Sequence, residues 1–93
     1  MRQQYHDTLK KHFRRDLLNT RSDLGLTRDR MAELLSMDSS SLADLESGKY
    51  TCSAVTLLLY LFRCCPDSEA FLSDLQKEMD AVARQRGQLP SSK

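Results

Sequence analysis

Apolar residues recur along the chain at intervals that match the turn of an α-helix. In the N-terminal region they lie four residues apart, at Tyr5, Leu9, Phe13 and Leu17. This spacing places them on one helical face, so it predicts a helix over residues 4–24. The helix is expected to stop at Gly25, because glycine readily adopts the left-handed conformation that follows a last helical turn.

Two shorter helices are predicted next. Thr27 can cap a helix over residues 28–35, because a threonine hydroxyl accepts a hydrogen bond from a backbone amide of the first turn. Asp38 can cap a third helix in the same way, and Gly48 is its expected end. Two short helices joined by about three residues are typical of a helix-turn-helix.

The rest of the chain predicts two further helices. Residues 54–64 are apolar on nearly every side, a composition typical of a buried central helix, and Pro66 ends this segment. Residues 67–86 form the last predicted helix, and residues 88–93 are expected to be a flexible tail. The predicted fold class is therefore all-α, a compact five-helix bundle in a single domain over residues 1–87.

The last predicted helix carries its own apolar stripe, whose members are Leu72, Leu75, Met79 and Val82. This stripe has two interpretations, which can both hold. It either folds back onto the core or pairs with a second chain, giving a homodimer through this helix. The predicted core comprises Leu9, Phe13, Leu17, Met31, Leu34, Leu35, Leu42, Leu45, Val55, Leu58, Leu59, Leu61, Phe62, Leu72 and Leu75.

Composition adds three expectations. No apolar run is long enough to cross a membrane, and no apolar run follows the basic N-terminus, so a cytoplasmic location without membrane association is predicted. The three cysteines, Cys52, Cys64 and Cys65, match no zinc spacing and are expected to be reduced thiols. His6 and His12 do not share a helical face closely, so no metal or other cofactor is predicted.

One segment, RSDLGLTRDRMAELLSMDSSSLADLESGKY, resembles the phage-repressor or XRE-type helix-turn-helix family. Three motifs carry the resemblance. They are Gly-Leu-Thr before the second helix, Ala-Glu within it, and a hydrophobe followed by Glu-x-Gly-Lys at the end of the third helix. They stand here at Gly25, Leu26, Thr27, Ala32, Glu33, Leu45, Glu46, Gly48 and Lys49. The similarity covers about residues 13–65 and implies a DNA-binding transcriptional regulator whose third helix enters the major groove.

The resemblance also implies roles for particular residues. Arg21 and Glu46 would form an ion pair between the first and third helices. Arg28 and Lys49 would contact phosphates, together with backbone amides near Ser47. The base-reading positions would be Ser39, Ser40, Ala43 and Asp44.

The charge of this region is unusual for a DNA-docking segment. Residues 27–50 hold three basic and five acidic side chains, a sum of −2. Affinity for DNA depends largely on neutralising phosphates, so the expected duplex binding is weak or dimer-dependent. The alternative is a non-catalytic protein-interaction module on the same scaffold. No enzymatic activity is predicted, since the nucleophiles and bases form no recognisable constellation.

Overall fold

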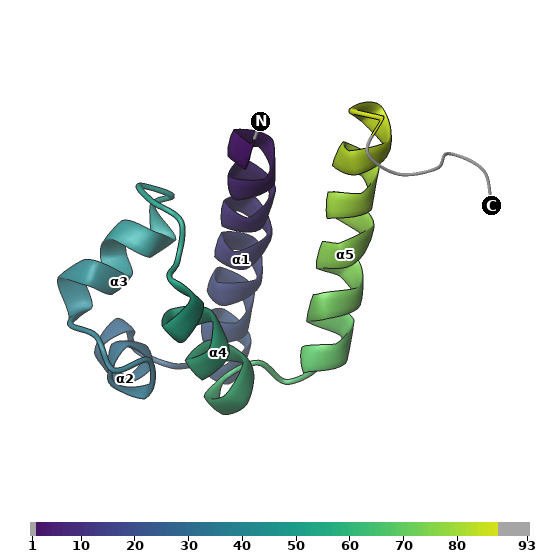
Figure 1. Cartoon of the computed structure of the whole chain (residues 1–93). Coiled ribbons are helices and arrows are strands. Elements are labelled where there is room, and N and C mark those ends of the chain that lie inside the picture. Colours follow the sequence, from purple (N-terminus) through teal and green to yellow (C-terminus); the bar gives the residue numbers. More distant parts are fainter. Residues whose placement is uncertain (1, 88–93) are drawn as a thin grey trace.

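The computed structural model describes residues 2–87, which form five helices (Figure 1). Their bounds are α1 Arg2–Leu24, α2 Arg28–Leu34, α3 Ser39–Glu46, α4 Ala54–Arg63 and α5 Ser68–Gln85. The predicted all-helical fold is confirmed, and no strand occurs within residues 2–87. The predicted tail, residues 88–93, lies outside the described residues.

Short polar side chains begin the later helices where the sequence indicates. The capping residues of α2 to α5 each accept a hydrogen bond from the backbone amide three residues later, and they are Thr27, Asp38, Ser53 and Asp67. Each cap satisfies an amide that has no partner within its own helix. The amide of Ser41 thereby holds the pKa of the Asp38 carboxyl below its ordinary value.

Buried side chains from all five helices meet in one core. Its largest fully buried side chains are Phe13, Leu17, Met31, Leu35, Leu42, Tyr60 and Phe71. The ring of Tyr60 lies 5.2 Å from that of Phe13 and 5.9 Å from that of Phe71, measured between centroids. Tyr60 therefore joins α4 to α1 through an edge-to-face contact and to α5 through a tilted contact.

The Tyr60 hydroxyl is buried with polar partners on α1. It donates a hydrogen bond to the Asp16 carboxylate. Since a hydroxyl has one proton, Thr20 must be the donor in the 2.8 Å contact between its own hydroxyl and that of Tyr60. Burial, followed by the hydrogen bond to Asp16, raises the pKa of Tyr60 above its ordinary value. This buried tyrosine was absent from the predicted core.

Helix α5 returns antiparallel alongside α1 (Figure 1). Leu75 is buried there, and Met79 and Val82 are partly buried. The His12 ring nitrogen Nε2 lies 3.1 Å from the Phe71 carbonyl oxygen, which fixes the start of α5 against the middle of α1. The structure therefore shows Leu75, Met79 and Val82 folded back toward the core, whereas Leu72 is exposed. Pairing of this helix with a second chain stays a prediction.

The predicted core is wrong at four positions, which are exposed: Val55, Leu58, Phe62 and Leu72. The prediction that α4 is a buried central helix rests on its composition, which is apolar on nearly every side. Helix α5 instead runs along α1 and leaves one face of α4 uncovered (Figure 1). Only the opposite face, with Tyr60 and Leu61, is buried.

Candidate functional site

The connection between α2 and α3 turns sharply at a serine. Ser36 lies at φ +57°, in the left-handed region that residues other than glycine rarely adopt. The amide of Met37 donates to the Ala32 carbonyl at 3.0 Å, and that of Ser36 donates to the Glu33 carbonyl at 3.1 Å. These two bonds make a Schellman motif, which ends α2 and directs the chain into α3.

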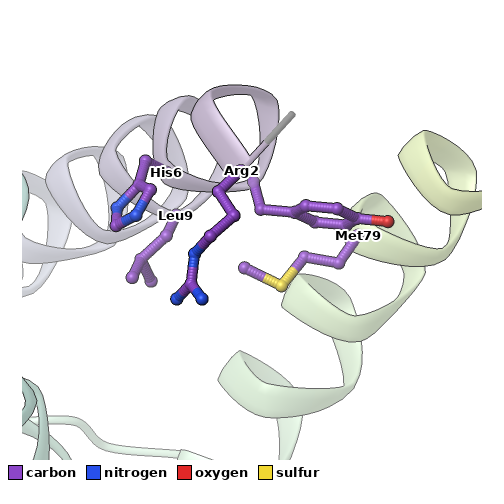
Figure 2. Close-up of a pocket in the computed structure, with 5 residues that line it drawn as sticks. Arg2, His6, Leu9 and Met79 are labelled. Atoms are coloured by element: carbon purple, nitrogen blue, oxygen red, sulfur yellow. The ribbon is translucent and has the colours of Figure 1, made fainter.

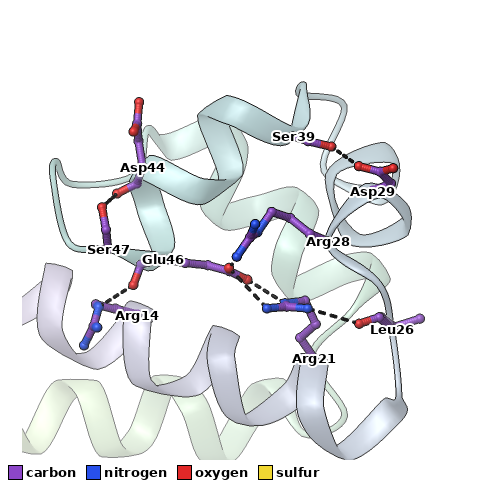
Figure 3. A network of polar contacts seen from close by, with 9 residues as sticks. All are labelled: Arg14, Arg21, Leu26, Arg28, Asp29, Ser39, Asp44, Glu46 and Ser47. Carbon is purple, nitrogen blue, oxygen red and sulfur yellow. Dashed lines mark hydrogen bonds and ion pairs between the residues drawn. The ribbon is translucent and has the colours of Figure 1, made fainter.

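Helix α3 has an inward and an outward face. Leu42, Leu45 and Glu46 are buried. The residues predicted to read bases or contact the backbone of DNA are exposed or partly exposed, and they are Ser39, Ser40, Ala43, Asp44, Ser47 and Lys49. In Figure 3, Asp44 projects away from α1 while the Glu46 side chain projects toward it. The structure therefore brings the predicted contact residues to one outward surface.

The serines at the start of α3 already have carboxylate partners. The Ser39 hydroxyl donates to Asp29 of α2 (Figure 3). The Ser40 hydroxyl donates to the Asp38 carboxylate at 3.0 Å. A hydroxyl has a single proton, so these two side chains offer a ligand only acceptor oxygens unless a carboxylate releases them.

Glu46 is the centre of a polar cluster beneath α3 (Figure 3). Its side chain is only 6% exposed. Arg21 binds both carboxylate oxygens, at 2.6 Å from Nε and 3.3 Å from Nη2. A further guanidinium nitrogen of Arg21 donates to the Leu26 carbonyl at 3.3 Å. The ion pair implied by the family resemblance is thus present, and it joins α1 to the end of α3.

Arg28, predicted as a phosphate contact, also lies against Glu46. Its Nε donates to a Glu46 carboxylate oxygen at 3.2 Å, and its side chain is half exposed. A guanidinium carries further donors on its terminal nitrogens, which have no partner within residues 2–87. With Arg21 and Arg28 facing a single carboxylate, the cluster has a net charge of +1.

Arg14 is a contributor that the sequence did not assign to this cluster. Its Nε donates to the Glu46 backbone carbonyl at 2.5 Å (Figure 3). Together with four other α1 residues it lines a shallow hollow of about 320 Å³, the others being Lys11, Arg15, Leu18 and Asn19. Basic α1 side chains therefore reach the C-terminal end of α3. Arg15 instead binds Glu78 of α5 at 3.0 Å.

A second hollow, of about 380 Å³, lies between the N-terminal turns of α1 and the C-terminal half of α5 (Figure 2). This hollow is lined by Arg2, Tyr5, His6, Leu9 and Met79. No group of three or more metal-ligating side chains with suitable geometry occurs within residues 2–87. None of the described helices is both long and apolar enough to cross a membrane.

The three cysteines are free thiols. Burial raises the pKa of Cys52 to about 11, and burial also raises the pKa values of Cys64 and Cys65 above the ordinary value. Because the thiolate is the reactive form, we expect Cys52 in the folded protein to alkylate about a hundredfold more slowly at pH 8 than an ordinary thiol.

Iodoacetamide labelling followed by peptide mass mapping measures this rate. In denaturant, where burial is lost, the three thiols should react at similar rates. Labelling of Cys52 at the same rate in the folded and unfolded protein would contradict its burial.

Comparisons with known proteins give no further assignment. No family model matches the chain, and no significant match was found among curated proteins or solved structures.

Proposed function

We propose that this chain is a DNA-binding transcriptional regulator of the XRE helix-turn-helix type, in which α2 and α3 form the helix-turn-helix. The observation that carries the proposal is the orientation of α3. The buried Glu46 cluster holds its inner face against α1, and its outer face carries small side chains that could approach a DNA groove. A rigidly supported helix with an accessible opposite face is what groove docking requires.

Phosphate contacts in this proposal come from the edges of the α2–α3 unit. The terminal nitrogens of Arg28 remain for a phosphate while Nε stays on Glu46. Lys49 is exposed just beyond α3. The backbone amides of Ser47 and Gly48 already donate to the Ala43 and Leu45 carbonyls, so the phosphate contact at this edge would come from the Lys49 side chain. Arg28 is partly fixed by Glu46 before binding, so less side-chain entropy is lost on contact with a phosphate.

The outer face of α3 also limits affinity in this proposal. Ser39 and Ser40 are engaged by Asp29 and Asp38, and Asp44 brings a negative charge toward the DNA backbone. Duplex binding is therefore proposed to be weak or to depend on a homodimer, because two half-sites bound together gain affinity through effective concentration.

Removing the Asp44 charge tests this assignment. We expect Asp44→Gln to tighten binding to random duplex DNA about fivefold, since the substitution removes a charge that repels phosphates. Asp44→Arg should tighten binding further and steepen the slope of log affinity against log salt by about one unit. Fluorescence anisotropy of a labelled duplex at several low salt concentrations measures both effects.

Asp74→Arg is the matched control, because Asp74 is exposed on α5 and the substitution changes the net charge equally. If Asp74→Arg has the same effect as Asp44→Arg, the gain reflects overall charge and α3 is not the contact surface. If neither Asp44 substitution changes affinity, DNA docking through α3 is wrong.

The second candidate is a non-catalytic protein-interaction module on the same scaffold. The hydrogen bond from Ser39 to Asp29 favours it, because it closes the start of α3 with an acidic group where DNA readers need donors. In that case a partner protein would contact the outer face of α3, which carries Ser39, Ser40, Ala43 and Asp44. Absence of duplex binding by the wild-type chain and by Asp44→Arg alike would favour this candidate.

A further inference from the structure

One face of α4 is apolar and uncovered. Val55 is 66% exposed, Leu58 47% and Phe62 77%. Their spacings of three and four residues place them on a single helical stripe, which we call the α4 face. An isolated exposed hydrophobic side chain is common, but three consecutive members of one stripe form a continuous patch.

The size of the α4 face fits the core of a small interface. An aromatic side chain buries roughly 150–250 Å² and an aliphatic one less, so at these exposed fractions the three side chains together offer an apolar area on the order of 300–400 Å². A standard interface buries about 800 Å² per partner, with an apolar centre and a polar rim. The α4 face could therefore form the centre of an interface of modest affinity.

We propose that the α4 face packs against the α4 face of a second copy of this chain, with the two helices antiparallel about a two-fold axis. This inference deepens the dimer dependence of the proposed DNA binding, but the association itself requires no DNA. It places the dimer surface on α4 rather than on α5, because three apolar side chains of α4 are exposed, whereas Leu72 is the one exposed member of the α5 stripe.

The charge of α4 favours a second copy over an acidic or basic partner. From Ala54 to Phe62 the helix carries no charged side chain, so nothing on this face selects a partner by charge. The one charged residue of α4, Arg63, donates to the Leu34 carbonyl of its own chain at 2.9 Å. Two such faces can meet without bringing like charges together or desolvating an unpaired charge.

The spacing of the stripe is self-complementary in the antiparallel orientation. Leu58 lies close to the centre of the stripe, with Val55 three residues before it and Phe62 four residues after it. Under a two-fold axis near Leu58, the small side chain of Val55 meets the large ring of Phe62 from the other copy. Each end of the contact then pairs a smaller residue with a larger one, which allows the side chains of the two helices to interdigitate.

Sedimentation equilibrium of the 93-residue chain without DNA tests the proposal. The wild type should self-associate with a Kd on the order of 10–100 μM. Val55→Lys and Phe62→Glu should each weaken association by about tenfold or more, because each buries an unpaired charge. Tyr50→Glu is the matched control, an exposed aromatic residue outside α4. It should leave association unchanged.

Mixing the two charge variants tests the antiparallel register. In a mixed dimer, Lys at position 55 of one copy would meet Glu at position 62 of the other, while the second contact would keep its native Val55 and Phe62. The mixture should therefore associate more strongly than either variant alone. If the mixture associates no more strongly than either variant alone, the antiparallel pairing is wrong.

Two other outcomes would overturn the α4 surface itself. One is a wild-type chain that stays monomeric at several hundred micromolar, and the other is a wild-type dimer that Phe62→Glu does not weaken. These outcomes are separable from failure of the DNA proposal, because anisotropy with a random duplex too short to hold two copies reports DNA contact by a monomer. Circular dichroism of each variant verifies that it folds.

Discussion

Glu46→Ala is expected to lower the free energy of unfolding by about 3–5 kcal/mol, the usual consequence of removing one partner from a buried ion pair. Glu46 is 6% exposed and Arg21 is 25% exposed, so little water can replace the lost carboxylate. The two guanidinium groups of Arg21 and Arg28 would then face each other without their shared anion. Urea denaturation followed by circular dichroism measures the loss.

Glu33→Ala is the matched control for this measurement. Glu33 binds Arg30 at 2.8 Å, but the two side chains are 70% and 54% exposed. An exposed ion pair of this kind contributes about 0–1 kcal/mol, because water solvates both charges in its absence. Equal losses for Glu46→Ala and Glu33→Ala would contradict the description of Glu46 as the buried centre of the cluster.

The contact between Arg21 and Glu46 shows what the sequence could predict. Its two residues lie 25 positions apart, and helical periodicity alone places neither beside the other. The family resemblance supplied the pairing, and the structure contains it. The caps of α2 and α3 needed no resemblance, because Thr27 and Asp38 are short polar residues directly before periodic apolar segments.

The exposure of α4 could not be predicted from its own residues. A helix that is apolar on nearly every side is buried when other helices surround it, and this depends on where α5 goes. Helix α5 follows α1, so Tyr60 and Leu61 face the core while Val55 and Phe62 do not. The periodicity of α4 alone contains no information about the direction of α5.

Two features around α3 could also not be predicted from the sequence. The turn at Ser36 adopts a left-handed conformation without glycine, so no residue marked it. Arg14 reaches the Glu46 carbonyl across 32 positions, and nothing in the basic run of α1 distinguishes it from its neighbours. Basic side chains on one helix differ only in what the fold brings near them, which is a tertiary property.

The two faces of α3 differ in their environment and in the roles proposed for them. The inner face of α3 is fixed by Leu42, Leu45 and Glu46, all buried. Its outer face contains no basic side chain, so in the proposed function the positive charge must come from Arg28 and Lys49 at its edges. Such a surface would position the domain on a duplex through phosphates more strongly than it would discriminate bases.

The two phenylalanines on either side of the α4–α5 connection should differ strongly in how much their truncation lowers the free energy of unfolding. Phe71→Ala is expected to cost about 3–5 kcal/mol of unfolding free energy, because the ring is 2% exposed and contacts both His12 and Tyr60. Phe62→Ala should change the stability of the monomer by less than about 0.5 kcal/mol, because Phe62 is 77% exposed.

The comparison must be made at a protein concentration of about 1 μM, well below the dissociation constant proposed for the α4 face. Association with a second copy stabilises the folded chain only as concentration rises. At about 200 μM, Phe62→Ala should therefore become less stable than the wild type, while the deficit of Phe71→Ala is already present in the dilute monomer. A loss at Phe62 that is as large in dilute solution as in concentrated solution would mean that this ring packs within its own chain, and the α4 face would not be a surface for a second copy.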